Sequence, residues 1–127
     1  MMSDSEDISK KQFLAPKNGK SGLYIYRTYN FVGAARTPTL YLDGNEIGDI
    51  AAKSYIFTEI KPGIHTISAG GFFENTDKLK STFKTESGKN HFVEASFSLG
   101  IFIGQVVLEE VAENIGKKGV LETNLAK

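Results

Sequence analysis

From Gly22 onward the chain alternates short hydrophobic runs with residues that favour turns. The runs are rich in Leu, Ile, Val, Phe, Tyr and Thr, and they are bounded by Gly, Pro, Asn, Asp or Ser. Regular spacing of this kind is typical of all-β domains, and no helix-length periodic segment separates the runs, as a parallel α/β fold would require. The pattern predicts an antiparallel β-sandwich of about seven short strands with at most one short helix.

Individual segments give more local predictions. Residues 23–26, Leu-Tyr-Ile-Tyr, are apolar at every position, which predicts a central strand covered on both faces. Residues 78–85 alternate apolar and polar side chains, which predicts a strand with one solvated face. Residues 106–111 predict a further strand, and residues 112–116 predict a single helical turn that ends at Gly116.

Glycine, proline and aspartate mark the predicted turns between strands. Asp43 and Gly44 tolerate the positive φ angles that a tight hairpin demands. Pro62 and Gly63 fit a type II turn, because proline sets φ at one central position and glycine adopts the left-handed conformation at the next. Gly88 lies in a Ser-Gly-Lys-Asn stretch that predicts another hairpin turn.

The first 21 residues differ in character from the rest of the chain. They are polar, contain Pro16 and Gly19, and show no sustained hydrophobic period, so residues 1–21 are expected to form a flexible N-terminal leader. An amphipathic turn over residues 8–14 is an alternative for part of this leader. Residues 22–127 then form a single β-sandwich domain, and folding at this chain length buries roughly two-thirds of the unfolded surface.

The charge balance excludes two classes of partner. The sequence has 15 basic and 15 acidic side chains, and its formal net charge is +0. A nucleic-acid-binding protein needs an excess of Lys and Arg on one face, and electrostatic adsorption to anionic lipid needs a similar excess. We therefore expect no nucleic-acid partner and no direct adsorption to a membrane. The absence of cysteine excludes disulfides, thiolate metal sites and a cysteine nucleophile in this sequence.

Few residues carry recognisable chemistry. His65 and His91 are the only histidines, and neither has a second ligand at a known metal-binding spacing, so we expect no metal site and no cofactor. Residues 19–21, Gly-Lys-Ser, resemble the end of a phosphate-binding loop but lack its earlier glycine and its following helix. Hydrolase nucleophile motifs are also absent. The sequence therefore predicts no catalytic residues and a domain that is not an enzyme.

Scattered carboxylates leave an alternative open. Folding can bring Asp43, Glu46, Asp49 and Glu59 together, as it does the carboxylate pair of a glycosidase. The chain would then be a small hydrolase or carbohydrate-active domain. A pocket that holds several carboxylates with raised pKa values would support this alternative.

One apolar stretch is a candidate contact surface. Leu99, Ile101, Phe102 and Ile103 lie between two predicted strands, where a connection normally crosses the surface and is polar. The stretch is either a buried strand or an exposed patch. An exposed patch would favour self-association or contact with a protein of the cell envelope.

Several short motifs, taken in order, resemble a bacterial family. They are Leu23-Tyr24-Ile25-Tyr26-Arg27, Tyr41-Leu42-Asp43-Gly44 with Ile47-Gly48, Tyr55, Pro62-Gly63-Ile64-His65, and Glu86-Ser87-Gly88-Lys89-Asn90-His91-Phe92. Their order and spacing are similar to those of the family called domain of unknown function 2846, over about residues 16–116. The core of two strands with Asp-Gly and Pro-Gly-x-His also resembles sandwich modules of the PEGA type. Those modules are binding or surface modules rather than enzymes.

The resemblance implies a small exported lipoprotein, tethered to a membrane through a lipidated N-terminal cysteine, and it carries no catalytic residues over. The chain departs from this pattern at its start. Residues 1–7 are acidic and lack the apolar run of a signal peptide, and no cysteine is present. A mature form that starts just after the lipid-bearing cysteine explains these departures together, and we prefer it to the alternative of a cytosolic member of the family.

The leading hypothesis is a non-catalytic binding or structural module of the cell envelope. We expect it in the periplasm, with its signal peptide removed, and tethered to the membrane in its native form. Its partner would be an envelope protein or a second copy of the chain. Membrane contact would come only through the lipid.

Overall fold

The computed structural model describes residues 4–17, 19–28, 37–70, 80–97 and 106–125. Two helices and nine strands lie within these ranges, and neither helix is long and apolar enough to cross a bilayer. The helices are α1 (Asp4–Lys10) and α2 (Glu113–Leu121). The strands are β1 (Ser21–Arg27), β2 (Thr39–Leu42), β3 (Asn45–Asp49), β4 (Ser54–Ile60), β5 (Gly63–Gly70), β6 (Lys80–Thr85), β7 (Asn90–Phe97), β8 (Val106–Val111) and β9 (Asn124–Leu125).

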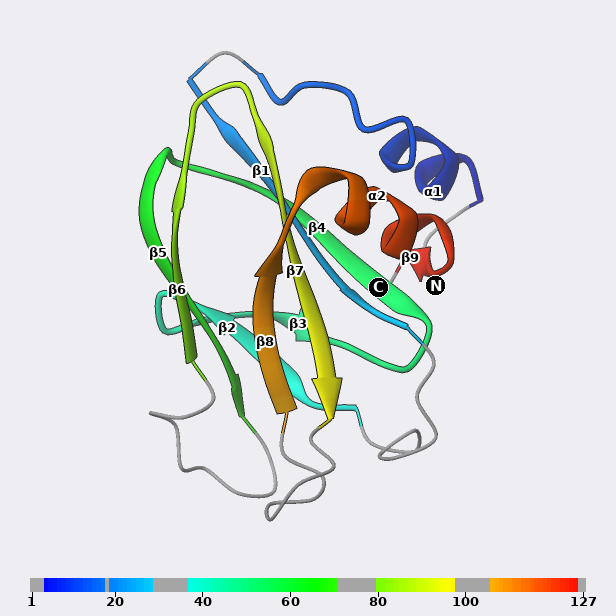
Figure 1. The fold of residues 1–127 in the computed structure, drawn as a ribbon, viewed down its shortest axis with the longest axis vertical. Coiled ribbons are helices and arrows are strands. Elements are labelled where there is room, and N and C mark those ends of the chain that lie inside the picture. Colours follow the sequence, from blue (N-terminus) through cyan, green and yellow to red (C-terminus); the bar gives the residue numbers. More distant parts are fainter. Residues whose placement is uncertain (1–3, 18, 29–36, 71–79, 98–105, 126–127) are drawn as a thin grey trace.

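The strands form two sheets that pack face to face (Figure 1). One sheet has five strands in the order β8-β7-β1-β4-β9, and the other has four in the order β3-β2-β5-β6. Most neighbouring strands are antiparallel, but β1 pairs with β7, and β4 with β9, in parallel. The predicted all-β sandwich is confirmed, and two parallel pairings lie within it.

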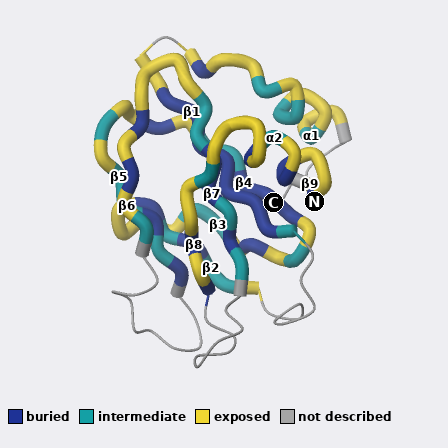
Figure 2. Tube along the Cα trace, viewed as in Figure 1, coloured by how far each residue is buried: buried dark blue, intermediate teal, exposed yellow. Residues whose placement is uncertain are grey.

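An aliphatic core fills the space between the sheets. Leu23 and Ile25 of β1 belong to this core together with Leu40 of β2 and Ile67 of β5, and all four residues are fully buried. Buried segments of β1, β4 and β7 run through the middle of the molecule (Figure 2). Complete burial of an aliphatic side chain stabilises a fold by roughly 1.5–3 kcal/mol. One face of β1 therefore contributes directly to the main core.

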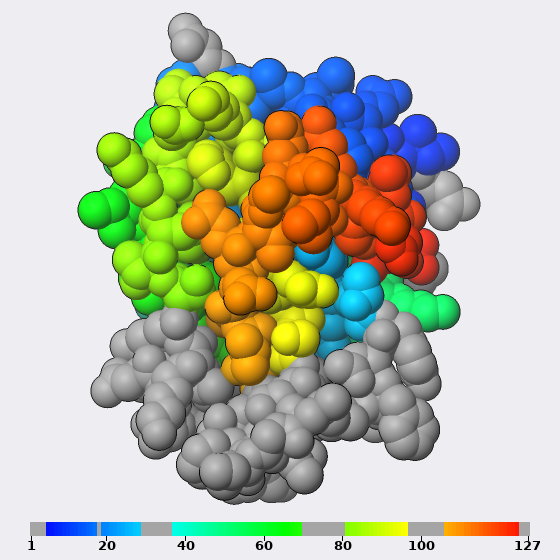
Figure 3. All heavy atoms as spheres, in the orientation of Figure 1, coloured from blue at the N-terminus to red at the C-terminus, as the bar shows by residue number. Residues whose placement is uncertain are grey.

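The other face of β1 is buried as well, by aromatic side chains. Tyr24 and Tyr26 point away from the aliphatic core and pack with Tyr55, Phe92 and Val120. Helices α1 and α2 lie over this face of the five-stranded sheet (Figure 1). The N-terminal segment (blue) and α2 (orange) meet on the same side of the molecule (Figure 3). Burial on both faces explains why β1 alternates aliphatic residues with tyrosine rather than with polar residues.

The helix after β8 is longer than the sequence predicts. The predicted turn ends at Gly116, whereas α2 continues to Leu121. Gly116 lies inside the helix, where an added Cβ would be 2.3 Å from Cβ of Phe92. Gly119 faces Tyr26, and a Cβ there would be 2.1 Å from Cε2 of that ring. The prediction is wrong because these glycines allow the helix to approach the sheet closely and do not form a left-handed cap.

The N-terminal segment packs on the sheet. Phe13 is half-buried against Tyr24 and Phe92, and α1 begins before the amphipathic turn considered for residues 8–14. Residues 1–21 are expected from the sequence to be a leader outside the domain, whereas the described part of this segment covers the aromatic face. Its few apolar residues are spaced too irregularly to show a period. The expected flexibility of the segment stays a prediction.

The turn residues have the backbone conformations that their types favour. Between β2 and β3, Asp43 has φ 51° and Gly44 has φ 85°. Gly63, which follows Pro62, has φ 136°, and Gly88 has φ 79°. The hairpin predicted around Gly88 is wrong, because β6 and β7 belong to different sheets and the turn carries the chain between them. Local sequence encodes a turn but not the sheet that the next strand joins.

Replacing Gly63 by alanine is expected to lower the free energy of unfolding by about 1 kcal/mol. An added Cβ would meet no atom within 4 Å, so the effect comes from backbone strain at φ 136° alone. Gly88→Ala is expected to behave similarly, because it combines φ 79° with open space. Urea unfolding followed by circular dichroism measures both variants, with Ser87→Ala as an exposed control. Unchanged midpoints for both glycine variants would contradict the turn conformations.

Candidate functional site

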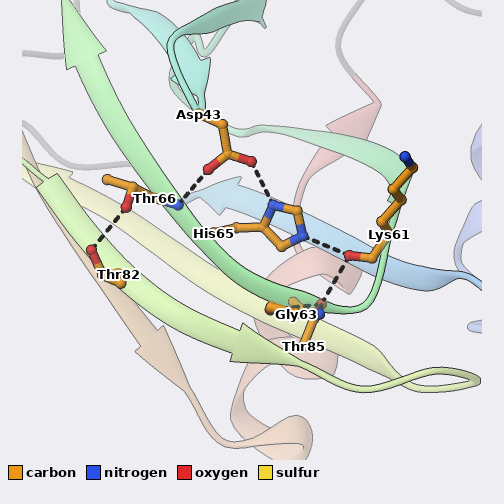
Figure 4. A network of polar contacts seen from close by, with 7 residues as sticks. All are labelled: Asp43, Lys61, Gly63, His65, Thr66, Thr82 and Thr85. Atoms are coloured by element: carbon orange, nitrogen blue, oxygen red, sulfur yellow. Dashed lines mark hydrogen bonds and ion pairs between the residues drawn. The ribbon is translucent and has the colours of Figure 1, made fainter.

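A polar network links the turn between β2 and β3 with the start of β5 (Figure 4). The pairing of β2 with β5 brings the carboxylate of Asp43 to β5. Oδ1 of Asp43 accepts the backbone N–H of Thr66 at 2.8 Å, and Oδ2 lies 2.5 Å from Nδ1 of His65. Nε2 of His65 lies 2.6 Å from the carbonyl oxygen of Lys61. His65 thus connects two turns that are distant in sequence.

The partners of His65 favour its charged form. A carbonyl oxygen can only accept a hydrogen bond, so Nε2 carries a hydrogen and donates a hydrogen bond to the carbonyl of Lys61. Nδ1 faces the carboxylate of Asp43, which favours a hydrogen on this nitrogen as well. Burial alone would lower the pKa of His65, but its hydrogen bonds and the charge of Asp43 outweigh burial and raise the pKa above its ordinary value. Burial alone would raise the pKa of Asp43, but hydrogen bonds from His65 and Thr66 hold that pKa below its ordinary value.

Threonine hydroxyls extend this network. Oγ1 of Thr66 and Oγ1 of Thr82 are 2.9 Å apart, on the opposite face of the strand from His65 because successive strand residues alternate sides. Oγ1 of Thr85 accepts the N–H of Gly63 at 3.2 Å. Both ring nitrogens of His65 are engaged, and no hydroxyl in the described part of the chain bonds to either. We call this arrangement of His65 between Asp43 and Lys61 the clamp.

The clamp is expected to make stability depend on pH. Because its folded pKa is raised, His65 stabilises the fold fully below its ordinary pKa of 6.5, and this contribution is lost as the pH rises through the raised value. Asp43 acts in the opposite sense, since its contribution is lost as the pH falls through its lowered pKa. The clamp is therefore most effective at mildly acid pH, between these two transitions.

His65→Gln tests this expectation. At mildly acid pH the free energy of unfolding of the variant is expected to be about 1 kcal/mol lower than that of wild type, a small effect because the charged hydrogen bond is partly exposed. The difference should shrink as the pH rises and His65 loses its charge. Urea unfolding over a pH series measures the difference, and His91→Gln is the control. A difference between wild type and His65→Gln that does not change with pH would contradict the charged clamp.

The other candidate carboxylates do not join Asp43. Glu46 is exposed on the edge strand β3, and Oδ1 of Asp49 accepts the hydroxyl of Thr39 at 2.8 Å. Glu59 lies on β4, in the other sheet, and accepts the backbone N–H of Lys17 at 3.2 Å. Within the described ranges, no group of three or more His, Cys, Asp or Glu residues is arranged to hold a metal ion.

The second histidine has a different role from the first. Nε2 of His91 accepts the backbone N–H of Glu86 at 3.0 Å, across the turn that joins the two sheets. Its Nδ1 lies 3.9 Å from a carboxylate oxygen of Glu110 on the neighbouring strand. Because Nε2 accepts this bond, the His91 side chain holds the turn between β6 and β7.

The predicted contact surface lies outside the described residues. It consists of Leu99, Ile101, Phe102 and Ile103, which fall between the described ranges 80–97 and 106–125. Whether these side chains form a buried strand or an exposed patch stays a prediction.

Sequence reasoning misses the aromatic floor, which we define as Tyr24, Tyr55, Phe57 and Phe92. Strand pairing places Phe57 and Phe92 directly opposite Tyr24 on either side. The rings of Tyr24 and Phe92 stack with centroids 5.0 Å apart, and those of Tyr24 and Phe57 are 4.6 Å apart. Burial raises the pKa of Tyr24 to about 12. The sequence signal was the aromatic content of three strands, but only their pairing shows that the rings form one surface.

Two grooves border this floor. One, of about 440 Å³, runs beside Phe13, Asn90 and Phe92 toward the first turn of α2. The other, of about 550 Å³, lies between α1 and β4, over Tyr24 and Phe57. Both grooves combine aromatic side chains with polar ones along their walls.

Comparison with known proteins agrees with the motifs. The family described as Protein of unknown function (DUF2846) matches residues 17–106. An uncharacterized protein of Haemophilus influenzae is 42% identical over 126 residues, which cover 99% of this chain and 73% of that protein. The resemblance drawn from the sequence motifs is confirmed: the chain belongs to the DUF2846 family.

Proposed function

We propose that this chain is a non-catalytic binding module of the bacterial cell envelope. The observation that carries the proposal is the contrast between its two candidate sites. His65 is engaged at both ring nitrogens, whereas the aromatic floor is bordered by two open grooves. Aromatic surface next to polar rims is typical of recognition sites.

The envelope location is part of the same proposal. We infer that the native protein is periplasmic and held at a membrane by a lipidated cysteine that precedes this domain. The motif resemblance supports this location, since small exported lipoproteins are what it implies.

Fractionation of the source bacterium tests the location. The product of the full reading frame is expected in the membrane fraction and should incorporate labelled palmitate. Replacing the expected lipid-bearing cysteine by serine should abolish the label and release the protein. A product found in the cytoplasm without lipid would overturn this part of the proposal.

Activity assays test the non-catalytic part. We expect no hydrolysis of ester, phosphate or glycosidic substrates. Turnover that is lost in Asp43→Asn, Glu59→Gln or His65→Gln, while the variant stays folded, would favour the carboxylate-dependent hydrolase instead.

A further inference from the structure

One short segment covers the aromatic floor, and we call it the strap. It comprises residues 7–17, from the middle of α1 to the approach to β1. The hydroxyl of Tyr24 donates to the carbonyl of Lys10 at 2.7 Å, and the hydroxyl of Tyr55 donates to Oδ1 of Asp7 at 2.8 Å. The sheet therefore holds the first half of the strap through tyrosine hydroxyls.

The second half of the strap is held through its backbone. Nδ2 of Asn90 donates to two successive carbonyls, those of Phe13 at 3.3 Å and Leu14 at 3.1 Å. At the far end, the carboxylate of Glu59 accepts the backbone N–H of Lys17 at 3.2 Å. Contacts of this type recognise a peptide backbone and depend little on its side chains.

Within this second half, the side chain of Phe13 packs against the floor. Its ring centroid is 5.3 Å from that of Tyr24 and 5.8 Å from that of Phe92, and Nζ of Lys117 on α2 lies 5.7 Å from it. The residue has φ 53°, a conformation that a bulky side chain rarely adopts. Backbone strain at a contact of this kind marks a place where the surroundings impose the conformation.

The strap does not fill the space around it. The two grooves of about 440 Å³ and 550 Å³ lie on either side of Ala15, which lines both. A segment flanked by open grooves has fewer neighbouring atoms to hold it than a core strand, so we expect it to open more readily than the core. Removing the strap would join the two grooves into one trough over the aromatic floor.

We propose that this trough is a peptide-binding site and that the strap occupies it in cis. The partner is a peptide segment of another protein that is non-helical where it replaces residues 13–17 and has an aromatic residue at the place of Phe13. Asn90 and Glu59 would bind its backbone, and Tyr24 with Phe92 would receive its aromatic ring. The strap is the chain's own competitor for the site, and its tethering gives it a high effective concentration.

This inference deepens the proposed binding role but does not depend on the lipid tether. Peptide binding by the isolated chain succeeds or fails whatever compartment the native protein occupies. Fractionation and binding experiments therefore separate a failure of the location from a failure of the site.

A labelled peptide with the sequence of residues 4–17 is the probe, and fluorescence polarisation measures its binding to the full chain. Phe13→Ala in the protein should weaken the strap and leave the trough intact, so the probe should bind roughly tenfold or more tighter than to wild type. A probe that itself carries Phe13→Ala should bind much more weakly.

Asn90→Asp in the Phe13→Ala background tests backbone recognition. The carboxylate would face two carbonyl oxygens, so probe binding should fall by about tenfold or more, because the amide donates to both carbonyls in the folded chain. Asn45→Asp, at an exposed position on β3, is the matched control and should leave binding unchanged. Equal loss in both variants would contradict a specific role of Asn90.

Hydrogen exchange on the wild-type chain gives an independent readout. The amides of Lys11 and Phe13, which bond to Asp7 and Lys10, should exchange through local opening, much faster than the amides of β1. Exchange of both regions at the same rate would show that the strap is an integral part of the core. That result, unfolding of the Phe13→Ala variant, or a folded variant that fails to bind the probe would each overturn the proposal.

Discussion

Gly119→Ala is expected to destabilise the domain by about 1–3 kcal/mol, although alanine is the better helix former. In an exposed helix the same change would stabilise by about 1 kcal/mol. Here an added Cβ would lie 2.1 Å from Cε2 and 2.5 Å from Cζ of Tyr26, whose side chain is buried. Either Tyr26 or α2 must move, and packing resists both movements. The sign of the change in urea unfolding therefore reports whether α2 rests on the sheet.

Two further variants frame this result. Gly116→Ala should also destabilise, because its Cβ would lie 2.3 Å from Cβ and Cγ of Phe92. Lys118→Ala, on the exposed side of the same helix, should change stability by no more than about 0.5 kcal/mol. A Gly119→Ala variant as stable as wild type would show that α2 does not pack on β1 as described.

Tyr24→Ala is expected to lower the free energy of unfolding by about 3–5 kcal/mol, the range for truncating a large buried aromatic residue. The Tyr24 side chain is 1% exposed, and its ring contacts those of Phe13, Phe57 and Phe92. Truncation would leave a cavity at the centre of the aromatic floor, under the strap. Chemical unfolding followed by circular dichroism measures the loss.

Tyr24→Phe is the matched control, because it keeps the ring and removes only the hydroxyl that donates to Lys10. Tyr24→Phe should lower the free energy of unfolding by about 1 kcal/mol, the typical effect of losing one hydrogen bond. A Tyr24→Ala variant no less stable than Tyr24→Phe would contradict the packing of the aromatic floor. The two variants together separate the contribution of packing from that of the strap contact.

The two histidines illustrate how far sequence reasoning reaches into the site. Their positions are visible in the sequence, and so is the absence of a known ligand spacing. The clamp formed by His65 depends on Asp43, which is 22 residues away and becomes its neighbour only through the pairing of β2 with β5. Likewise, Glu86 and Glu110 approach His91 from a turn and from another strand. No local pattern encodes these approaches.

The N-terminal segment shows the same limit on a larger scale. Residues 1–21 read as a polar leader because their few apolar residues follow no period. The packing role of Phe13 cannot be recognised without the surface that Tyr24 and Phe92 provide for its ring. That surface exists only because β1 pairs with β4 and β7. A segment that covers another element needs few apolar residues of its own.

By itself, the sequence determines the fold class and the turns of this protein. Both are local properties. Strand alternation depends on the direction of neighbouring side chains. The turns depend on the φ angles that their residues tolerate, as at Asp43, Gly44, Gly63 and Gly88. The tertiary structure alone decides the parallel pairing of β1 with β7, the course of α2 past Gly116, and the cover over the aromatic floor. These features depend on which surfaces meet across the fold, and that depends on packing between distant segments rather than on any local preference.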